Sequence, residues 1–102
     1  MNKSKKVVVL GGGSFGTVLA NLAASNGYQV ALWVRDSEHA LRINSEGANA
    51  TYHPELRLSE NIQASDSLKN VMKNASMVFI ATPSIVFEQI IERIRNLLEE
   101  DS

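Results

Sequence analysis

Apolar residues gather in four short runs along the chain, and longer stretches with a different spacing separate these runs. The first run, Val7–Leu10, is continuously apolar and β-branched, which is typical of a strand buried on both faces of a parallel sheet. The other three runs are similarly short and apolar. Together the runs predict strands at Lys6–Leu10, Gln29–Val34, Asn61–Ala64 and Met77–Ala81.

The stretches between the runs carry helical signals. In the first stretch, larger apolar residues recur at helical spacing, and two small residues would allow close approach to a sheet. These residues are Val18, Leu19, Leu22 and Ala23, and Ala20 and Ala24. The predicted helices are Ser14–Asn26, a short helix from a cap at Asp36 or Ser37 to about Ile43, Ser65–Asn74 with a cap at Ser65 or Asp66, and Ile85–Glu99. Residues 44–61 show no clean period and are expected to form an extended connection.

Strands that alternate with helices predict an α/β fold with a parallel sheet and right-handed crossovers. We expect one Rossmann-type domain over residues 1–102, with the strand order 3-2-1-4. The fourth strand is strongly apolar and would lie at an edge of the sheet. We therefore expect an amino-terminal fragment whose next strand lies beyond Ser102. The exposed edge can also pair with a second copy of the chain, so a homodimer is a possible assembly.

Composition narrows the classes of function. The formal net charge is −1, so no basic field favours nucleic acid. The longest apolar runs are far shorter than the about 20 residues that a membrane span needs, so we expect no membrane insertion. The chain has no cysteine, which excludes disulfides and thiolate metal sites and fits a cytoplasmic location. No cluster of His, Asp and Glu has metal-ligand spacing.

A glycine-rich turn follows the first predicted strand and opens the first predicted helix. Gly11, Gly13 and Gly16 satisfy the pattern G-x-G-x-x-G in the context that makes it specific for dinucleotides. The first glycine permits a tight turn, the second lets a pyrophosphate approach the backbone, and the third allows close helix–strand packing. Amides around Ser14 and Phe15, aided by the helix dipole, would hold the phosphates. The alternative is a strand–helix turn without a ligand.

The end of the second strand distinguishes the two nicotinamide cofactors. An acidic residue about 20 positions beyond the glycines is typical of NAD-binding domains, where it bonds the ribose 2′-hydroxyl. This chain has Arg35 followed by Asp36. A guanidinium there suits a 2′-phosphate, and Asp36 can act as a helix cap or as the ribose ligand. NADP(H) is therefore favoured over NAD(H), with Asp36 favoured as a cap.

Other chemistry-bearing residues give weaker signals. Pro83 makes a rigid turn after the fourth strand, at the edge where open α/β sheets bind ligands, although a purely structural turn explains it nearly as well. His39 is expected to be solvated. His53 has no carboxylate partner at a spacing that would indicate a catalytic base. Trp33 and Phe79 alternate with apolar neighbours and are expected in the core.

Residues 11–20, Gly-Gly-Gly-Ser-Phe-Gly-Thr-Val-Leu-Ala, resemble the signature G-x-G-S-aromatic-G-T-A-L-A of bacterial NAD(P)-dependent glycerol-3-phosphate dehydrogenases. The resemblance covers nearly the whole chain. It continues through Leu32–Arg35, Ile43-Asn44, Asn49, Tyr52, Pro54, Leu58, Asn61-Ile62, Ala64–Asp66 and Ala81–Ser84. The chain departs from the family at Phe15, where Trp or Tyr is frequent, and at His53 and Arg57 in the following loop.

The resemblance implies an amino-terminal domain that binds NAD(P)H beside a helical carboxyl-terminal domain that contacts substrate. The whole enzyme would reversibly reduce dihydroxyacetone phosphate to sn-glycerol 3-phosphate for phospholipid synthesis. Ser14 and Phe15 would contact the cofactor phosphates, Arg35 the adenosine ribose or its phosphate, and Tyr52 the adenosine side. The catalytic residues of the family have no counterpart in this chain, so these residues alone are expected to be inactive.

Two alternatives share the glycine turn. A related dehydrogenase, acting on 6-phosphogluconate or a ketoacid, should lack the spacing of Asn44, Asn49, Tyr52 and Pro54. A non-catalytic nucleotide-sensing module would be complete at this length and would usually carry an acid at position 35. Arg35 and the unfinished sheet count against that module.

Overall fold

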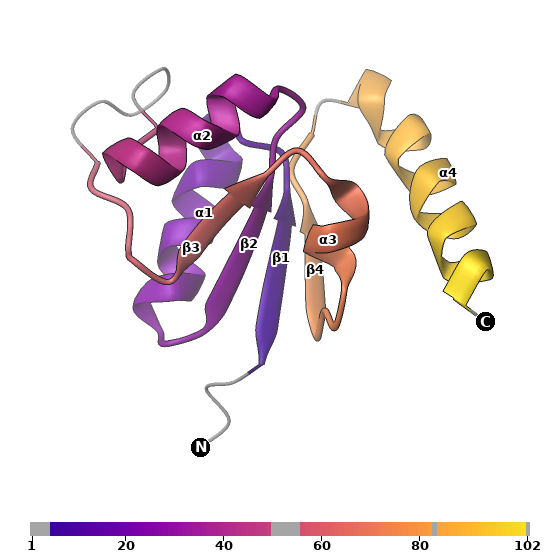
Figure 1. Ribbon diagram of the computed structural model, residues 1–102, viewed down its shortest axis with the longest axis horizontal. Coiled ribbons are helices and arrows are strands. Elements are labelled where there is room, and N and C mark those ends of the chain that lie inside the picture. The colour runs from indigo at the N-terminus through magenta and orange to yellow at the C-terminus, as the bar shows by residue number, and fades with distance from the viewer. Residues whose placement is uncertain (1–4, 50–55, 83, 102) are drawn as a thin grey trace.

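The computed structural model describes residues 5–49, 56–82 and 84–101. Strands and helices alternate along these residues, as the hydrophobic pattern predicts (Figure 1). The elements are β1 (Lys6–Leu10), α1 (Ser14–Ser25), β2 (Gln29–Trp33), α2 (Ser37–Glu46), β3 (Ile62–Ser65), α3 (Leu68–Met72), β4 (Met77–Ile80) and α4 (Ser84–Asp101).

The four strands form one parallel sheet in the order β3-β2-β1-β4, which confirms the predicted topology. Strand β1 lies between β2 and β4, with Val9 opposite Leu32 on one side and Phe79 on the other. The sequence runs from β1 to β2 and β3 on one side, then returns to β4 on the other. The strand order therefore reverses at β1, which is where open α/β sheets form ligand sites.

Helices cover both faces of the sheet (Figure 1). Val7 and Val9 of β1 pack into a cluster with residues of α1 and α2, whereas Val8 and Leu10 pack into a second cluster with residues of α3 and α4. All four apolar side chains of β1 are therefore buried. Full burial of such a side chain contributes about 1.5–3 kcal/mol, so the central strand is a main source of stability.

Helix α1 packs against the sheet through a face of small side chains. The buried residues are Gly16, Thr17, Ala20 and Ala24. Val18 is 44% exposed and Leu22 is 60% exposed, so these two apolar residues lie largely outside the face that the helix buries. Small side chains let the helix axis approach β1 and β2 closely, and this turns the bulkier residues outward.

The ends of α2 and α3 also differ from the predictions. Helix α2 continues past Ile43 to Glu46, because Gly47 takes the left-handed conformation (φ 68°) and its N–H bonds to the Ile43 carbonyl. The expectation that residues 44–61 are all extended is wrong for this last turn. Helix α3 begins at Leu68 with Ser67 as its cap, not Ser65 or Asp66, because Ser65 still belongs to β3.

Candidate functional site

A cleft of about 540 Å³ lies at the carboxyl ends of β1, β2 and β4. It brings together the glycine-rich turn, the end of the second strand and the turn after the fourth strand, which are far apart in the sequence. The cleft is lined by Gly11, Gly12, Gly13, Ser14, Phe15, Trp33, Val34, Arg35, Asp36, His39, Ala81 and Thr82. Its place at the reversal of strand order matches the position expected for a ligand site in such a sheet.

Glycines in the turn meet steric demands that other residues cannot. Gly11 has φ +124°, and a Cβ there would come within 2.8 Å of the Ala81 carbonyl oxygen. A Cβ on Gly16 would overlap the Gly11 carbonyl oxygen, so this glycine allows α1 to start directly against the turn. By contrast, a Cβ on Gly13 would meet nothing within 4 Å. Gly13 therefore borders open space in the cleft, where a ligand can approach its backbone.

The amino terminus of α1 faces this cleft. Gly13 is the N-cap residue and supplies no side chain to cap the first turn, and no acidic residue lies in that turn. Such an end carries a partial positive charge and attracts anions. The two following side chains, Ser14 and Phe15, line the cleft and are exposed, Phe15 to 69%.

Arg35 and Asp36 follow β2 and are both exposed where they line the cleft. The Asp36 carboxylate accepts a hydrogen bond of 3.0 Å from the Glu38 N–H and so caps α2, as the sequence favoured. This bond uses only one of the two carboxylate oxygens. A contact between Asp36 and a ribose stays a prediction. Arg35 also lines the cleft, and its contact with a 2′-phosphate is likewise a prediction.

Asn49 forms a hydrogen-bonded network behind the turn that the sequence analysis missed. Its side chain is 1% exposed. The Nδ2 group donates to the Gly12 carbonyl (2.6 Å) and to the Thr17 hydroxyl (2.8 Å), and Oδ1 lies 2.8 Å from His39 Nε2. The Thr17 hydroxyl in turn donates to the Gly13 carbonyl (2.7 Å). His39 is thus a structural partner that lines the cleft, and the expectation of a merely solvated side chain is wrong.

Trp33 connects the cleft to the second core cluster. The indole is 3% exposed, and its N–H donates to the Asp66 carbonyl (3.0 Å). The Arg93 guanidinium of α4 lies 5.6 Å from the ring centroid. Trp33 is therefore a core residue, as predicted, although it also lines the cleft.

Comparison with known proteins identifies the family. Residues 6–102 match the family described as NAD-dependent glycerol-3-phosphate dehydrogenase N-terminus. The chain belongs to this family. The two alternatives, a dehydrogenase of another substrate class and a nucleotide-sensing module, are therefore not supported.

The family's curated and solved members agree with this assignment. A glycerol-3-phosphate dehydrogenase (NAD(P)+) from Alcanivorax borkumensis is 44% identical over 94 residues, which are 92% of this chain and 27% of that protein. The crystal structure of glycerol-3-phosphate dehydrogenase from Coxiella burnetii superposes with a TM-score of 0.87 at 33% identity, over 92% of this chain and 29% of that one. The chain thus spans less than a third of the length of the relatives that it matches.

Some residues that the family signature singles out lie outside the described part of the chain. These are Tyr52, His53, Pro54 and Pro83. Next to Pro83, Thr82 lines the cleft, and its hydroxyl oxygen is buried with no hydrogen-bond partner among the described residues. Buried hydroxyls nearly always have a partner, so this oxygen marks a place where a bound ligand could supply one.

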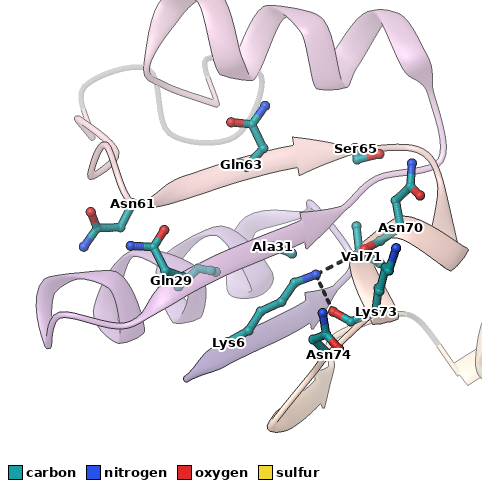
Figure 2. A pocket seen from close by; sticks show the side chains of 11 residues that line it. Lys6, Gln29, Ala31, Asn61, Gln63, Ser65, Asn70, Val71, Lys73 and Asn74 are labelled. Carbon is teal, nitrogen blue, oxygen red and sulfur yellow. Dashed lines mark hydrogen bonds between the residues drawn. The ribbon is translucent and has the colours of Figure 1, made fainter. Parts of the chain in front are cut away.

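A second hollow, of about 470 Å³, lies on the open sheet face beside α3 (Figure 2). Lys6 Nζ donates to the Asn70 and Lys73 carbonyls at 3.1 and 2.9 Å. Burial, and the positive charge of Lys73, lower the pKa of Lys6. The remaining lining is mainly carboxamide and small side chains, including Gln29 and Gln63. The described residues that form this hollow include none of the family's glycine-turn residues.

The described ranges contain neither a metal-binding cluster nor a membrane-spanning helix. No group of three or more His, Cys, Asp and Glu side chains there is arranged to hold a metal ion. Among the described helices, none combines the length and the apolar character that crossing a membrane requires.

Proposed function

We propose that this chain binds the dinucleotide of an NAD(P)-dependent glycerol-3-phosphate dehydrogenase in the cleft at the carboxyl ends of β1, β2 and β4. The observation that carries the proposal is the open space beside Gly13 at the amino terminus of α1. There the pyrophosphate would meet backbone amides and the positive end of the helix. Ser14 and Phe15 would flank it, and Gly11 and Gly16 would keep the turn tight.

The residues of the cleft fit a nicotinamide dinucleotide along its length. Arg35 and Asp36 would meet the adenosine ribose, with Tyr52 near the adenosine. The buried hydroxyl of Thr82, beside Pro83, would gain a partner from the cofactor on the far side of the turn. When bound, the nicotinamide supplies the hydride chemistry, and the protein contributes binding and orientation.

We further propose a preference for NADP(H) over NAD(H). The guanidinium of Arg35 can form paired, charge-assisted hydrogen bonds with a 2′-phosphate. Asp36 is engaged as the cap of α2, which weakens the case for a ribose acid at this place. The same exposed pair could also accept NAD(H), with Arg35 stacked on adenine, so the preference depends on the balance of these two charges.

In the whole protein, this domain would serve the reduction of dihydroxyacetone phosphate to sn-glycerol 3-phosphate, which feeds phospholipid synthesis in the cytoplasm. The names of the relatives support the dehydrogenase activity. The substrate contacts and the catalytic residues would belong to sequence that this chain does not contain. The chain alone would therefore bind cofactor without turning over substrate.

Calorimetric titration of the chain with NADPH and NADH at low salt tests the proposal. We expect tighter binding of NADPH, and loss of that preference in Arg35→Ala. Arg42→Ala is the matched control, because Arg42 is an exposed arginine of the neighbouring helix outside the cleft lining. Equal binding of both cofactors would overturn the NADP(H) preference, and binding of neither would overturn the site itself.

A homodimer would follow if the apolar edge strand β4 pairs with a second copy. Met77 at this edge is 54% exposed, and Val78, Phe79 and Ile80 are only partly buried. Light scattering of the chain and of Met77→Lys tests this assembly, since a charge on an edge strand opposes pairing. A monomer in both cases would overturn it.

A further inference from the structure

Two polar side chains behind the glycine-rich turn have no role in the function proposed above. Asn49 follows α2, and His39 lies within α2 and lines the cleft. We propose that Asn49 is a positioning residue for the turn, and that His39 holds the Asn49 carboxamide in the orientation that the turn requires. The inference rests on the proposed function, because it concerns how the turn would receive the pyrophosphate of a dinucleotide.

The orientation of the carboxamide follows from its partners. The Gly12 carbonyl can only accept, so the group that lies 2.6 Å from it must be the amide nitrogen of Asn49. The Thr17 hydroxyl gives its hydrogen to the Gly13 carbonyl and therefore accepts from the same nitrogen. The Asn49 oxygen then points to His39 Nε2, which must carry a hydrogen. Both the Nε2–H tautomer and the imidazolium form of histidine meet that condition.

The network fixes two consecutive peptide groups. In a trans peptide, the carbonyl of one residue and the N–H of the next point in opposite directions. Asn49 holds the Gly12 carbonyl on the inner side of the turn, so the Gly13 N–H is directed to the opposite side. Thr17 holds the Gly13 carbonyl in the same way, through its N–H and its hydroxyl. The amide of Ser14 is then directed away from Thr17, where the cleft-lining face of the turn lies.

Burial makes this arrangement rigid. Asn49 is 1% exposed and Thr17 is fully buried, so neither side chain can replace its partners with water. An unmade hydrogen bond at such a place costs about 1–3 kcal/mol, which disfavours any rotation of the two peptides. A turn that already presents its amides need not be ordered when the pyrophosphate arrives, and preorganisation of this kind raises affinity.

Matched variants of the chain test the role. NADH affinity is measured by energy transfer from Trp33, the only tryptophan, which lines the cleft. ADP competes in the same assay as a probe with the pyrophosphate but without nicotinamide. We expect Asn49→Ala to weaken both ligands about tenfold or more, and the Gly13 amide resonance to shift without any ligand. Asn44→Ala is the control, because Asn44 also bonds main chain through its carboxamide but lies outside the network.

His39 gives a rescue experiment. In His39→Gln, the amide nitrogen can donate from nearly the position of Nε2, so NADH affinity should stay close to that of the unchanged chain. His39→Leu fills similar space without a donor and should weaken NADH severalfold. If Asn49→Ala does not fold, the two His39 variants carry the test, because they change only the His39–Asn49 hydrogen bond of the network.

The outcomes separate this inference from the proposed function. Equal NADH affinity in Asn49→Ala and Asn44→Ala, with an unshifted Gly13 resonance, would overturn the positioning role while leaving the cofactor site intact. Equal loss in His39→Leu and His39→Gln would overturn the part assigned to His39. If the unchanged chain binds neither cofactor, the proposed function fails, and the Gly13 amide resonance then tests the positioning role by itself. A shift in Asn49→Ala without one in Asn44→Ala supports that role. No shift in Asn49→Ala refutes it.

Discussion

Asn44 and Ala64 are joined by two hydrogen bonds that imitate the pairing of neighbouring strands. Asn44 Nδ2 donates to the Ala64 carbonyl (2.9 Å), and the Ala64 N–H donates to Asn44 Oδ1 (2.8 Å). Ala64 lies in β3, the edge strand on this side of the sheet. One side chain of α2 therefore satisfies both outward-facing main-chain groups at the middle of the edge, where an unpaired strand would otherwise invite association.

We expect Asn44→Ala to lower the free energy of unfolding by about 1–3 kcal/mol, because it leaves a partly buried N–H and carbonyl without partners. Urea denaturation measures the loss. Ser45→Ala is the matched control, since the Ser45 hydroxyl makes only a local, exposed bond of 3.3 Å to the Arg42 carbonyl. A loss no larger than that of Ser45→Ala would show that water satisfies the edge equally well.

Gly13 and Gly16 should separate binding from folding. Alanine at Gly16 would overlap the Gly11 carbonyl, so we expect severe loss of folded protein. Gly13 has φ −78° and ψ −165°, which any residue adopts, and its Cβ would enter open space. Gly13→Ala should therefore fold normally and bind NADH about tenfold more weakly or worse, because the methyl group occupies the approach of the pyrophosphate. Thermal unfolding and calorimetry give the two readouts, and normal affinity in Gly13→Ala would place the ligand elsewhere.

Asp36 has a structural role and a charge, and two substitutions separate them. Asp36→Ala should destabilise the chain by about 1 kcal/mol through loss of the α2 cap, whereas Asp36→Ser keeps a capping oxygen and most of the stability. Both variants remove a negative charge beside Arg35, so both should bind NADPH more tightly relative to NADH. Weaker NADH binding in Asp36→Ser, with NADPH unchanged, would instead identify Asp36 as a ribose ligand.

Periodicity in the sequence predicted the parts of the fold that depend on neighbours in the chain. Continuous β-branched runs located all four strands to within a residue or two, and the glycine spacing located the turn. The misplaced helix ends depended on single residues. The φ angle of Gly47 extends α2, and the Ser67 hydroxyl starts α3. Neither alters the apolar period that the predictions used.

The hydrogen bonds of Asn49 and Asn44 could not be predicted in the same way. Asn49 bonds residues 37 and 32 positions earlier in the chain, and Asn44 bonds a residue 20 positions later. Both asparagines lie in the stretch that showed no clean period. Only the resemblance to the family marked them, as part of a spacing. The structure supplies the physical reason for that spacing: one asparagine covers the sheet edge, and the other supports the turn.

The lowered pKa of Lys6 predicts how the free energy of unfolding changes at alkaline pH. Burial, and repulsion from Lys73, lower its pKa below the ordinary value of 10.5 that it keeps in the unfolded chain. Below the lowered pKa, Lys6 is charged in both states, so the folded state bears the full cost of holding this charge partly buried and near Lys73. Between the lowered pKa and 10.5, the unfolded chain binds more protons, so the contribution of Lys6 to stability rises with pH.

Lys73→Gln should raise the pKa of Lys6 by removing the repulsion, while the Lys73 main-chain carbonyl that Lys6 bonds remains. We therefore expect a small gain in unfolding free energy at neutral pH, and a smaller rise in stability towards pH 10.5 than in the unchanged chain. Burial is the larger cause of the lowered pKa, so part of the rise should persist. Urea denaturation at several pH values measures both effects, with Lys69→Gln in the adjoining helix α3 as a control. Identical pH profiles for the two variants would show that repulsion from Lys73 has no effect on folding.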